Sequence, residues 1–253
     1  MTGARLTHIV RHPVKSAGYE ELERAALTEG RPLASDRIWA VRTAGGKLDG
    51  APEGWVTKLA FVRGAAEGSL QAIRARFDEA TGTLALTHPK RPDFTGTLPG
   101  DGPALVEWLR PLWPATRPAA IDLVTRQDGG ALTDRPEPYV AILNHATLRA
   151  LGTAMGRDLS IHRWRGNLWL DGLQPWAEFD LIDREIAIGE ARLRVERRIT
   201  RCVATTFDPE TGLPAGDTLA ALEQGWGHKD FGVYARVTRS GVIATGDPVT
   251  VLP

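Results

Sequence analysis

Glycine and proline interrupt this sequence so often that most of it is expected to form short strands joined by turns. The 253 residues include 27 glycines and 17 prolines. The apolar runs between them are short and β-type, as in Arg5–His12 and Arg37–Thr43. Leu70–Phe77 and Thr83–Thr87 flank a polar turn and predict a hairpin. Many short strands with few helices favour β-barrel architecture over a doubly wound sheet.

Two segments have the apolar spacing of short helices. One follows Asp101, which can cap it, and ends by Pro114, while the other covers His145–Met155 with Asn144 as a candidate cap. The stretch between them is rich in proline, glycine and polar residues. We therefore predict a mainly β (α+β) protein with two β-barrel-like subdomains and a few short helices, divided into residues 1–115 and 125–253.

The charge balance excludes a global nucleic-acid footprint. Lysine plus arginine equals aspartate plus glutamate at 31 each, so any cationic site must be local. The apolar content of 42% is ordinary for a soluble globular protein. The first residues lack the apolar region of a signal peptide, and no stretch approaches the ~18–20 apolar residues of a membrane span. We therefore expect a cytoplasmic protein with no membrane span.

Cys202 is the only cysteine. A single thiol excludes an internal disulfide, a four-thiolate zinc site and an iron–sulfur cluster. It leaves three roles: a nucleophile, a single soft ligand to a metal held by something else, or a small buried apolar residue. Arg201 and Arg198 favour a thiolate. Cysteine–histidine catalysis would need an activating histidine, and none lies in a recognisable signature. The candidates for that role are His145, His162 and His228.

Two motifs in the first half place cations where they could meet an anion. Lys15 and Ser16 follow a strand and could offer a phosphate charge and hydrogen-bond donors, although the glycine spacing of a P-loop is missing. A solvated surface turn is the alternative. Arg37 enters a strand beside Asp36, which could hold it over a pocket or form an ordinary ion pair with it.

The second half contributes another such motif. If Arg163, Arg165 and Asn167 lie on a strand, as we predict, their side chains share one face because they are two residues apart. Two buried cations would need a bound anion or a carboxylate such as Glu178. These residues, together with others along the chain, predict an anion pocket beside a reactive cysteine. The others are Lys15, Ser16, Arg37 and Arg201.

The sequence resembles a known family in several strings. HPVKSAGYEEL and LASDRIWAV resemble the N-terminal β-barrel domain that precedes MOSC domains. Later strings resemble the MOSC domain itself, which is named after molybdenum cofactor sulfurase, and they occur in the same order as in that family. These strings are RWRGNLWLDG, PWAEFD, IAIGEARLRV, RITRCVATTFDPETG, GVYARV and GDPV.

The resemblance implies a molybdenum cofactor (molybdopterin, a pterin dithiolene carrying a phosphate) held between the two domains. In relatives such as the mitochondrial amidoxime-reducing component, the cysteine of the Arg-Cys motif ligates molybdenum, which here implies Cys202. A soft thiolate suits a metal already bound by two sulfurs, and the arginine fork suits phosphate. The implied cofactor contacts are Lys15, Ser16, Arg37, Asp134, Asn144, Arg163, Arg165, Asn167 and Arg201.

The resemblance further implies an oxidoreductase that reduces N-hydroxylated or N-oxide substrates, with Cys202 as its catalytic metal ligand. Some bacterial relatives carry a ferredoxin-like domain with several cysteines. Since this sequence has one cysteine and ends at Pro253, we expect its electrons to come from a separate ferredoxin- or cytochrome-type donor protein. The alternative is a carrier of molybdenum cofactor or sulfur that uses a persulfide on Cys202. A binding module with a buried cysteine is a third reading.

Overall fold

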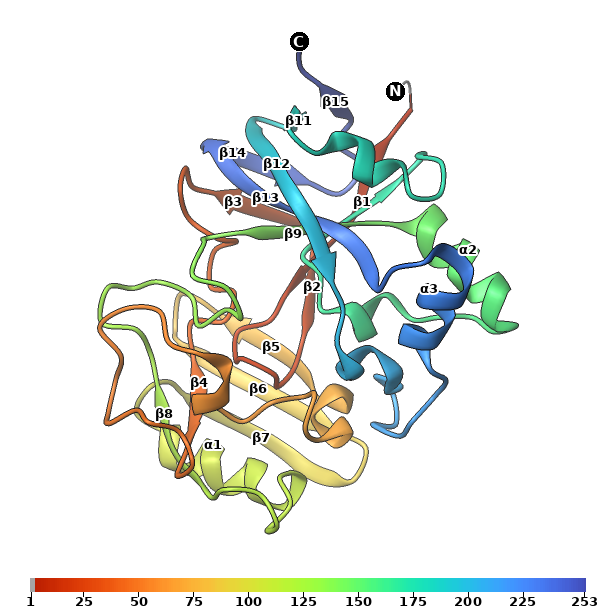
Figure 1. Ribbon diagram of the computed structural model, residues 1–253. Helices are drawn as coiled ribbons and strands as arrows, with labels where there is room; N and C mark the ends of the chain where they lie inside the picture. Colours follow the sequence, from red (N-terminus) through yellow and green to blue (C-terminus); the bar gives the residue numbers. More distant parts are fainter. Residues whose placement is uncertain (1–2) are drawn as a thin grey trace.

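The computed structural model describes residues 3–253, which form a mixed α and β structure dominated by strands (Figure 1). Within this range, no helix combines the length and the apolar character needed to cross a bilayer. The α-helices are α1 (Gly102–Leu109), α2 (His145–Met155) and α3 (Thr218–Trp226). The strands are β1 (Arg5–Arg11), β2 (Glu20–Leu22), β3 (Arg24–Leu27), β4 (Ala40–Thr43), β5 (Arg74–Asp78), β6 (Thr83–His88), β7 (Arg91–Thr97), β8 (Ala120–Val124), β9 (Val140–Asn144), β10 (Leu168–Asp171), β11 (Glu185–Ile188), β12 (Ala191–Thr200), β13 (Asp230–Arg239), β14 (Gly241–Ala244) and β15 (Val249–Val251). Short 3-10 helices are η1 (Lys58–Ala60), η2 (Gly68–Ala72), η3 (Arg110–Leu112), η4 (Ile161–Trp164), η5 (Ala177–Leu181) and η6 (Val203–Thr206).

The largest sheet has eight strands in the order β15-β11-β12-β13-β9-β10-β1-β2. Its strands pair antiparallel except for β9 and β10, which run parallel. In β12, Leu193 and Val195 are buried while Arg192 and Arg194 are exposed, the alternation expected of a strand with one face on a core. The sheet curls, because Leu6 N donates to Asp247 O over 2.9 Å and so joins β1 to the segment before β15.

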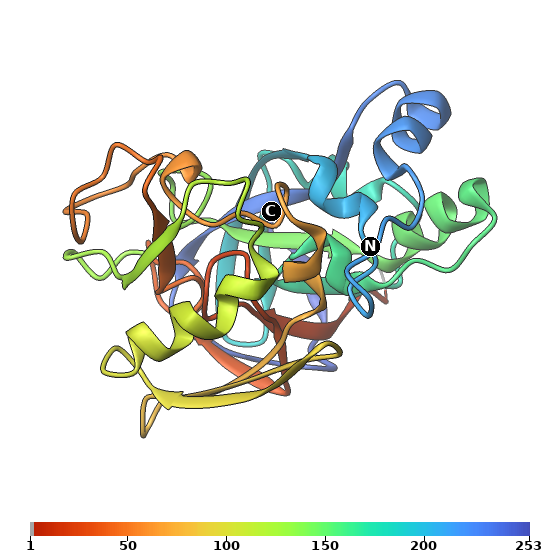
Figure 2. The same ribbon diagram turned by 90° about the horizontal axis from the view of Figure 1, so that it is seen from below.

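Three smaller sheets complete the fold: β3–β14, β4–β8 and β5–β6–β7. Figure 2 shows α1 lying along the three-stranded sheet. Leu105 and Leu109 of α1 are fully buried in the core beneath it, and Trp108 Nε1 donates to Pro92 O over 2.7 Å. Burial of this apolar face is what holds so short a helix in place.

The expectation of many short strands and few helices is confirmed, with one curled sheet and smaller sheets in place of two closed barrels. The predicted hairpin forms from β5 and β6, but its first strand begins at Arg74 and not at Leu70, because Gly68–Ala72 is the 3-10 helix η2. The predicted helix over His145–Met155 also forms, and the Asn144 side chain caps it by accepting from Ala146 N over 2.9 Å. Asp101 precedes α1 but does not cap it, because its carboxylate accepts from Thr97 N instead.

Strand pairing crosses the division predicted from the sequence. β1 pairs with β10 and β3 with β14, so strands near the N-terminus belong to sheets completed by the second half. β8, which lies at the predicted boundary, pairs with β4 of the first half. The limits of 1–115 and 125–253 therefore do not separate the hydrogen-bonded sheets, and as domain limits they stay a prediction.

Candidate functional site

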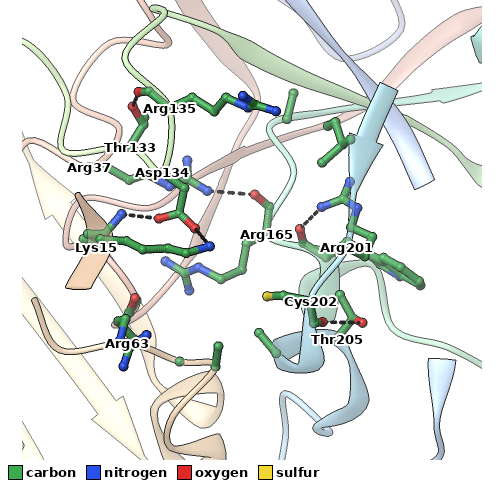
Figure 3. A pocket seen from close by; sticks show the side chains of 18 of the residues that line it. Lys15, Arg37, Arg63, Thr133, Asp134, Arg135, Arg165, Arg201, Cys202 and Thr205 are labelled. Atoms are coloured by element: carbon green, nitrogen blue, oxygen red, sulfur yellow. Dashed lines mark hydrogen bonds and ion pairs between the residues drawn. The ribbon is translucent and has the colours of Figure 1, made fainter. Parts of the chain in front are cut away.

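A pocket of about 180 Å³ lies where the two halves of the chain meet (Figure 3). Its walls carry eight basic side chains and two acidic ones, Asp134 and Glu137. A chain with no net charge thus concentrates positive charge at one place, which favours an anionic ligand. The basic residues are Lys15, Arg37, Lys58, Arg63, Arg135, Arg163, Arg165 and Arg201.

The turn after β1 supplies Lys15 and Ser16 to this pocket. Ser16 and Gly18 both adopt positive φ, at 65° and 79°, so the chain reverses tightly here. Lys15 is buried and its ammonium group donates to Asp134, whose other oxygen lies 3.4 Å from Lys58 Nζ. Burial alone would raise the pKa of Asp134, but the charge and hydrogen bond of Lys15 lower it to about 2. The Asp134 carboxylate therefore stays ionised and holds the Lys15 side chain in place.

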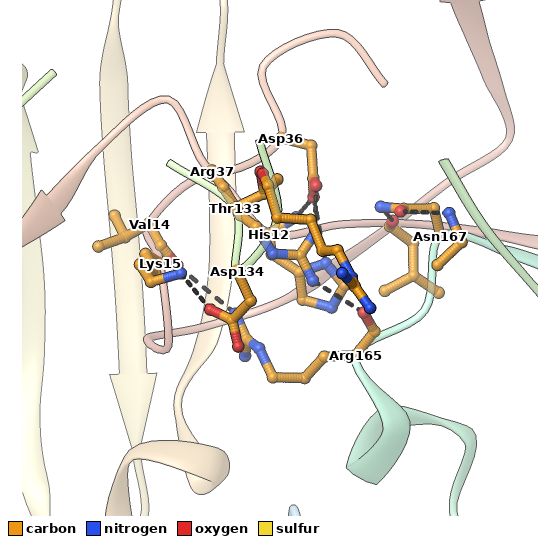
Figure 4. Close-up of polar contacts among 12 residues, drawn as sticks. His12, Val14, Lys15, Asp36, Arg37, Thr133, Asp134, Arg165 and Asn167 are labelled. Carbon is orange, nitrogen blue, oxygen red and sulfur yellow. Dashed lines mark hydrogen bonds and ion pairs between the residues drawn. The ribbon is translucent and has the colours of Figure 1, made fainter. Parts of the chain in front are cut away.

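Arg37 joins the two halves (Figure 4). One end of its guanidinium donates to the buried carboxylate of Asp36, and the other donates to the backbone carbonyl of Arg165 over 2.8 Å. Asp36 also accepts from the backbone N–H of His12 over 2.8 Å and lies 3.1 Å from His12 Nδ1. Arg37 has a positive φ of 54°, and its N–H donates to His12 O, so this uncommon conformation is held by neighbours.

The predicted Arg-x-Arg-x-Asn strand is wrong. Residues Ile161–Trp164 form the 3-10 turn η4, Arg165 ends it with a φ of 47°, and β10 begins only at Leu168. A Cβ on Gly166 would lie 1.9 Å from Leu143 Cδ1, so only glycine fits this tight passage. The local alternation of charged residues looked like a strand, but tertiary packing winds the segment into a turn.

Arg165 nevertheless lines the pocket. Its guanidinium donates to Gly18 O over 3.2 Å and to Val14 O over 3.5 Å. It makes no ion pair with a carboxylate among the described residues. Burial, followed by the charge of Arg37, lowers the pKa of Arg165 to about 9. Its charge is thus buried, and no carboxylate of the described residues is paired with it directly.

Asn167 and Asn144 have their amides committed to the fold. The Asn167 oxygen accepts from Ala141 N, and its amide group donates to Val10 O over 3.2 Å, so it links β9 to β1 at the pocket wall. Asn144 does not line the pocket. Its amide group donates to Glu178 over 2.8 Å. The sequence offers Glu178 as a partner for Arg163 and Arg165, but Glu178 pairs with Asn144 instead. Expecting Asn144 in the pocket was wrong because the α2 cap turns it away.

Cys202 is exposed and lies at the start of η6, where Figure 3 shows its sulfur directed into the pocket on the side of Arg165. The preceding Arg201 donates to Phe231 O and, over 2.8 Å, to Trp164 O. Burial lowers the pKa of Arg201 to about 10. The reading of Cys202 as a buried apolar residue is therefore wrong.

Histidine plays no part in the pocket. None of its lining residues is a histidine, and residues 3–253 hold no group of His, Cys, Asp and Glu arranged for a metal ion. The candidates lie elsewhere: His145 beside Trp169, His162 against Tyr19 and His228 beside Trp176. A cysteine–histidine pair at Cys202 is thus excluded within these residues, and any metal here must arrive with other ligands.

Sequence reasoning missed several pocket residues between β4 and β5. Lys58 lies in η1, Arg63 lies in the loop that follows it, and Gln71 lies in η2, where a strand from Leu70 was predicted. Arg135 and Glu137 follow Asp134 in a Pro-rich segment. Only their nearness in sequence to Asp134 could have pointed to the last two.

The fold and the pocket define a strand-rich protein with a lone cysteine beside a cationic cavity. Residues 130–250 match the MOSC domain, and residues 3–106 match the MOSC N-terminal beta barrel domain. The chain belongs to the family of MOSC domain proteins that carry this N-terminal domain. The expectation drawn from the sequence strings is thereby confirmed.

Curated relatives are distant. Mitochondrial amidoxime-reducing component 1 of Homo sapiens is 32% identical over 143 residues, covering 52% of this chain and 41% of that protein. Molybdenum cofactor sulfurase of Drosophila grimshawi is 31% identical over 117 residues, covering 44% of this chain and 15% of that protein. The matches span less than half of either relative. Among solved structures, the YUAD protein of Bacillus subtilis is 12% identical with a TM-score of 0.47, covering 97% of this chain and 93% of that one.

The chemistry of the pocket fits a phosphate-bearing pterin with a soft metal. In residues 3–253, the guanidinium groups of Arg165 and Arg201 hydrogen-bond only to carbonyls and form no ion pair with a carboxylate, which leaves their charge available to an anion. The buried Nε2 of Gln71, on the pocket wall, has no hydrogen-bond partner there and can donate to an acceptor. Among the described residues on the wall, only Cys202 offers a soft donor, its thiol.

Proposed function

We propose that this protein holds a molybdenum cofactor in the pocket and reduces N-hydroxylated or N-oxide compounds. The observation that carries the proposal is the position of Cys202, whose thiol enters a cavity walled by eight cations. The names of the relatives, amidoxime-reducing component and molybdenum cofactor sulfurase, agree with this assignment. The cofactor would lie between the two predicted domains, 1–115 and 125–253.

Each part of the site has a role in this proposal. Cys202 would be the sole protein ligand to molybdenum. Lys15, Ser16 and Arg37 would bind the phosphate and pterin from one side, and Arg165 and Arg201 from the other, with charges placed before the ligand arrives. Asp134 holds Lys15, and Asn167 ties together the strands behind the site. The bound cofactor would supply the two-electron chemistry, while the protein orients it and the substrate.

Electrons must come from outside this sequence. Reduction of an N-hydroxyl group to N–H consumes two electrons and two protons and releases water. The one cysteine leaves no set of thiolates for an iron–sulfur cluster. We therefore propose a separate ferredoxin- or cytochrome-type donor protein. We also propose that the reaction is cytoplasmic.

Metal analysis tests the proposal. Protein purified from a host that makes the cofactor should contain stoichiometric molybdenum and should reduce a model amidoxime with a chemical reductant. Cys202→Ala should abolish turnover, whereas Val203→Ala, at an exposed neighbour outside the pocket wall, should not. Protein without molybdenum under these conditions, or an active Cys202→Ala variant, would contradict it.

Sulfur transfer is the second candidate, because the exposure of Cys202 is what a persulfide carrier requires. After exposure to a cysteine desulfurase, intact-mass spectrometry should then find one added sulfur atom on the wild type and none on Cys202→Ala. An unmodified wild type would count against this function.

A further inference from the structure

We propose that Arg163, besides lining the pocket, is a positioning residue whose Nη1 fixes the loop of Cys202. The family resemblance had implied a cofactor contact for this residue. The hydrogen bonds of Arg163 indicate an additional task. The proposal concerns the proposed metal ligand, but its test does not require the metal.

The guanidinium of Arg163 is directed at the chain that follows Cys202. Its Nη1 donates to Thr205 O over 3.2 Å and to Ala215 O over 3.4 Å. Arg163 is only 3% exposed; in the described part of the chain it forms no ion pair, and its Nε has no hydrogen-bond partner. A buried guanidinium that bridges two carbonyls holds both of them, because releasing either one would leave the cation less satisfied.

The Thr205 residue passes this restraint on to Cys202. Its backbone N–H and its hydroxyl each lie 3.1 Å from Cys202 O, and both donate to that carbonyl. The Thr205 hydroxyl also lies 2.7 Å from the hydroxyl of Thr218, and both threonines are buried. Arg163, Thr205 and Cys202 therefore form one connected chain of hydrogen bonds.

Other hydrogen bonds also anchor this loop: Arg201 N donates to Lys229 O over 2.8 Å, and the Thr206 hydroxyl donates to Val203 O over 2.8 Å. Cys202 itself is exposed, as is Val203. At the other end of the loop, Ala215 N donates to Thr206 O over 2.8 Å. Because Arg163 also binds Ala215 O, it restrains this end of the loop as well. Without Arg163, the Thr205 and Ala215 carbonyls lose the donor they share.

The test measures the reactivity of Cys202 in the full chain purified from a host that cannot make the cofactor. Because Cys202 is the only cysteine, alkylation by iodoacetamide reports this loop alone. The rate plateau at high pH, where the thiol is ionised, removes the effect of the nearby charge. Arg163→Met should raise this plateau severalfold, and Arg163→Lys should raise it less because lysine keeps one donor. Arg149→Met, at an exposed ion pair, should match the wild type.

A second pair of variants keeps the proposal falsifiable. Thr205→Val should raise the plateau and Thr205→Ser should not, since serine retains the hydroxyl; this pair serves if Arg163→Met fails to fold. An unchanged plateau in both Arg163→Met and Thr205→Val would overturn the positioning role. If the wild type itself lacks molybdenum, only the proposed cofactor function fails.

Discussion

Arg201 donates a hydrogen bond to the backbone carbonyl of Trp164 over 2.8 Å. In the opposite direction, Arg163 donates to Thr205 O. The segment before β10 and the segment after β12 thus exchange arginine–carbonyl bonds in both directions. Arg37 adds a third such bond, from the first half to Arg165 O. The arginines of this pocket consequently build its walls as well as charge it.

Gly166→Ala should destabilise the protein. The added Cβ would collide with Leu143 Cδ1 at 1.9 Å, and overpacking of this kind costs about 1–3 kcal/mol. Urea unfolding should show the loss. The double variant Gly166→Ala/Leu143→Ala should lose less than the sum of the two single variants, because the colliding methyl group is gone. Strict additivity would refute the steric explanation.

Asp134→Asn should lower the unfolding free energy at pH 7 by about 1 kcal/mol, a modest value because the Asp134 side chain is half-exposed. The pKa of Asp134 is lowered in the fold to about 2. Its ionised form therefore stabilises the protein above the unfolded pKa of about 3.9, and this stability is lost as the pH falls towards 2. The difference between wild type and variant should shrink in unfolding curves taken below pH 4. A difference that is constant with pH would rule out this ion pair as its source.

Glu178→Gln should have the opposite pH dependence. Burial raises the pKa of the Glu178 carboxyl, although Asn144 and Thr147 donate to it. Its ionised form is therefore penalised in the fold, with no penalty below the unfolded pKa of about 4.3 and a growing one as the pH rises through the folded pKa. Glutamine can accept the same two hydrogen bonds without the charge. The unfolding free energy of the variant should therefore rise relative to that of the wild type as the pH goes from 5 to 8. The same difference between the two proteins at pH 5 and at pH 8 would contradict this explanation.

Cys202→Ser should leave the fold intact. The Cys202 side chain is exposed, and surface substitutions usually change the unfolding free energy by less than about 0.5 kcal/mol. Urea unfolding of the cofactor-free chain should show this near-identity. A larger loss would mean that the thiol packs into the core and does not face the pocket.

Regular elements were predictable where the local pattern and the tertiary environment agree. β5 and β6 flank a polar turn, and α2 begins at a capping asparagine, so both could be found from the sequence. The segment Ile161–Trp164 could not, because its turn depends on distant contacts. Trp164 stacks on Phe231 with ring centroids 3.8 Å apart, and Gly166 lies against Leu143.

The same distinction holds for the pocket. Lys15, Arg37 and Cys202 lie in short motifs whose residue types already indicate chemistry, and all three line the cavity. Lys58 and Arg63 reach it because the loop after β4 folds back, with Arg42 bridging to Phe61. No local sequence pattern encodes that return. Asn144 shows the converse, since a residue type suited to a site was used for a helix cap.

The pairing of β1 and β3 with strands of the second half bears on how such a protein can be recombined. The large sheet and the β3–β14 sheet each combine strands that precede the segment between Leu27 and Val140 with strands that follow it. In topological terms, that segment is an insertion, because the chain before it and the chain after it pair with each other in the same sheets. Exchanging residues 1–115 between relatives as a cassette would carry away β1, β2 and β3. Exchanging only the inserted segment would keep every strand of the large sheet together with Cys202, while replacing Arg37, Lys58 and Arg63 on the opposite wall.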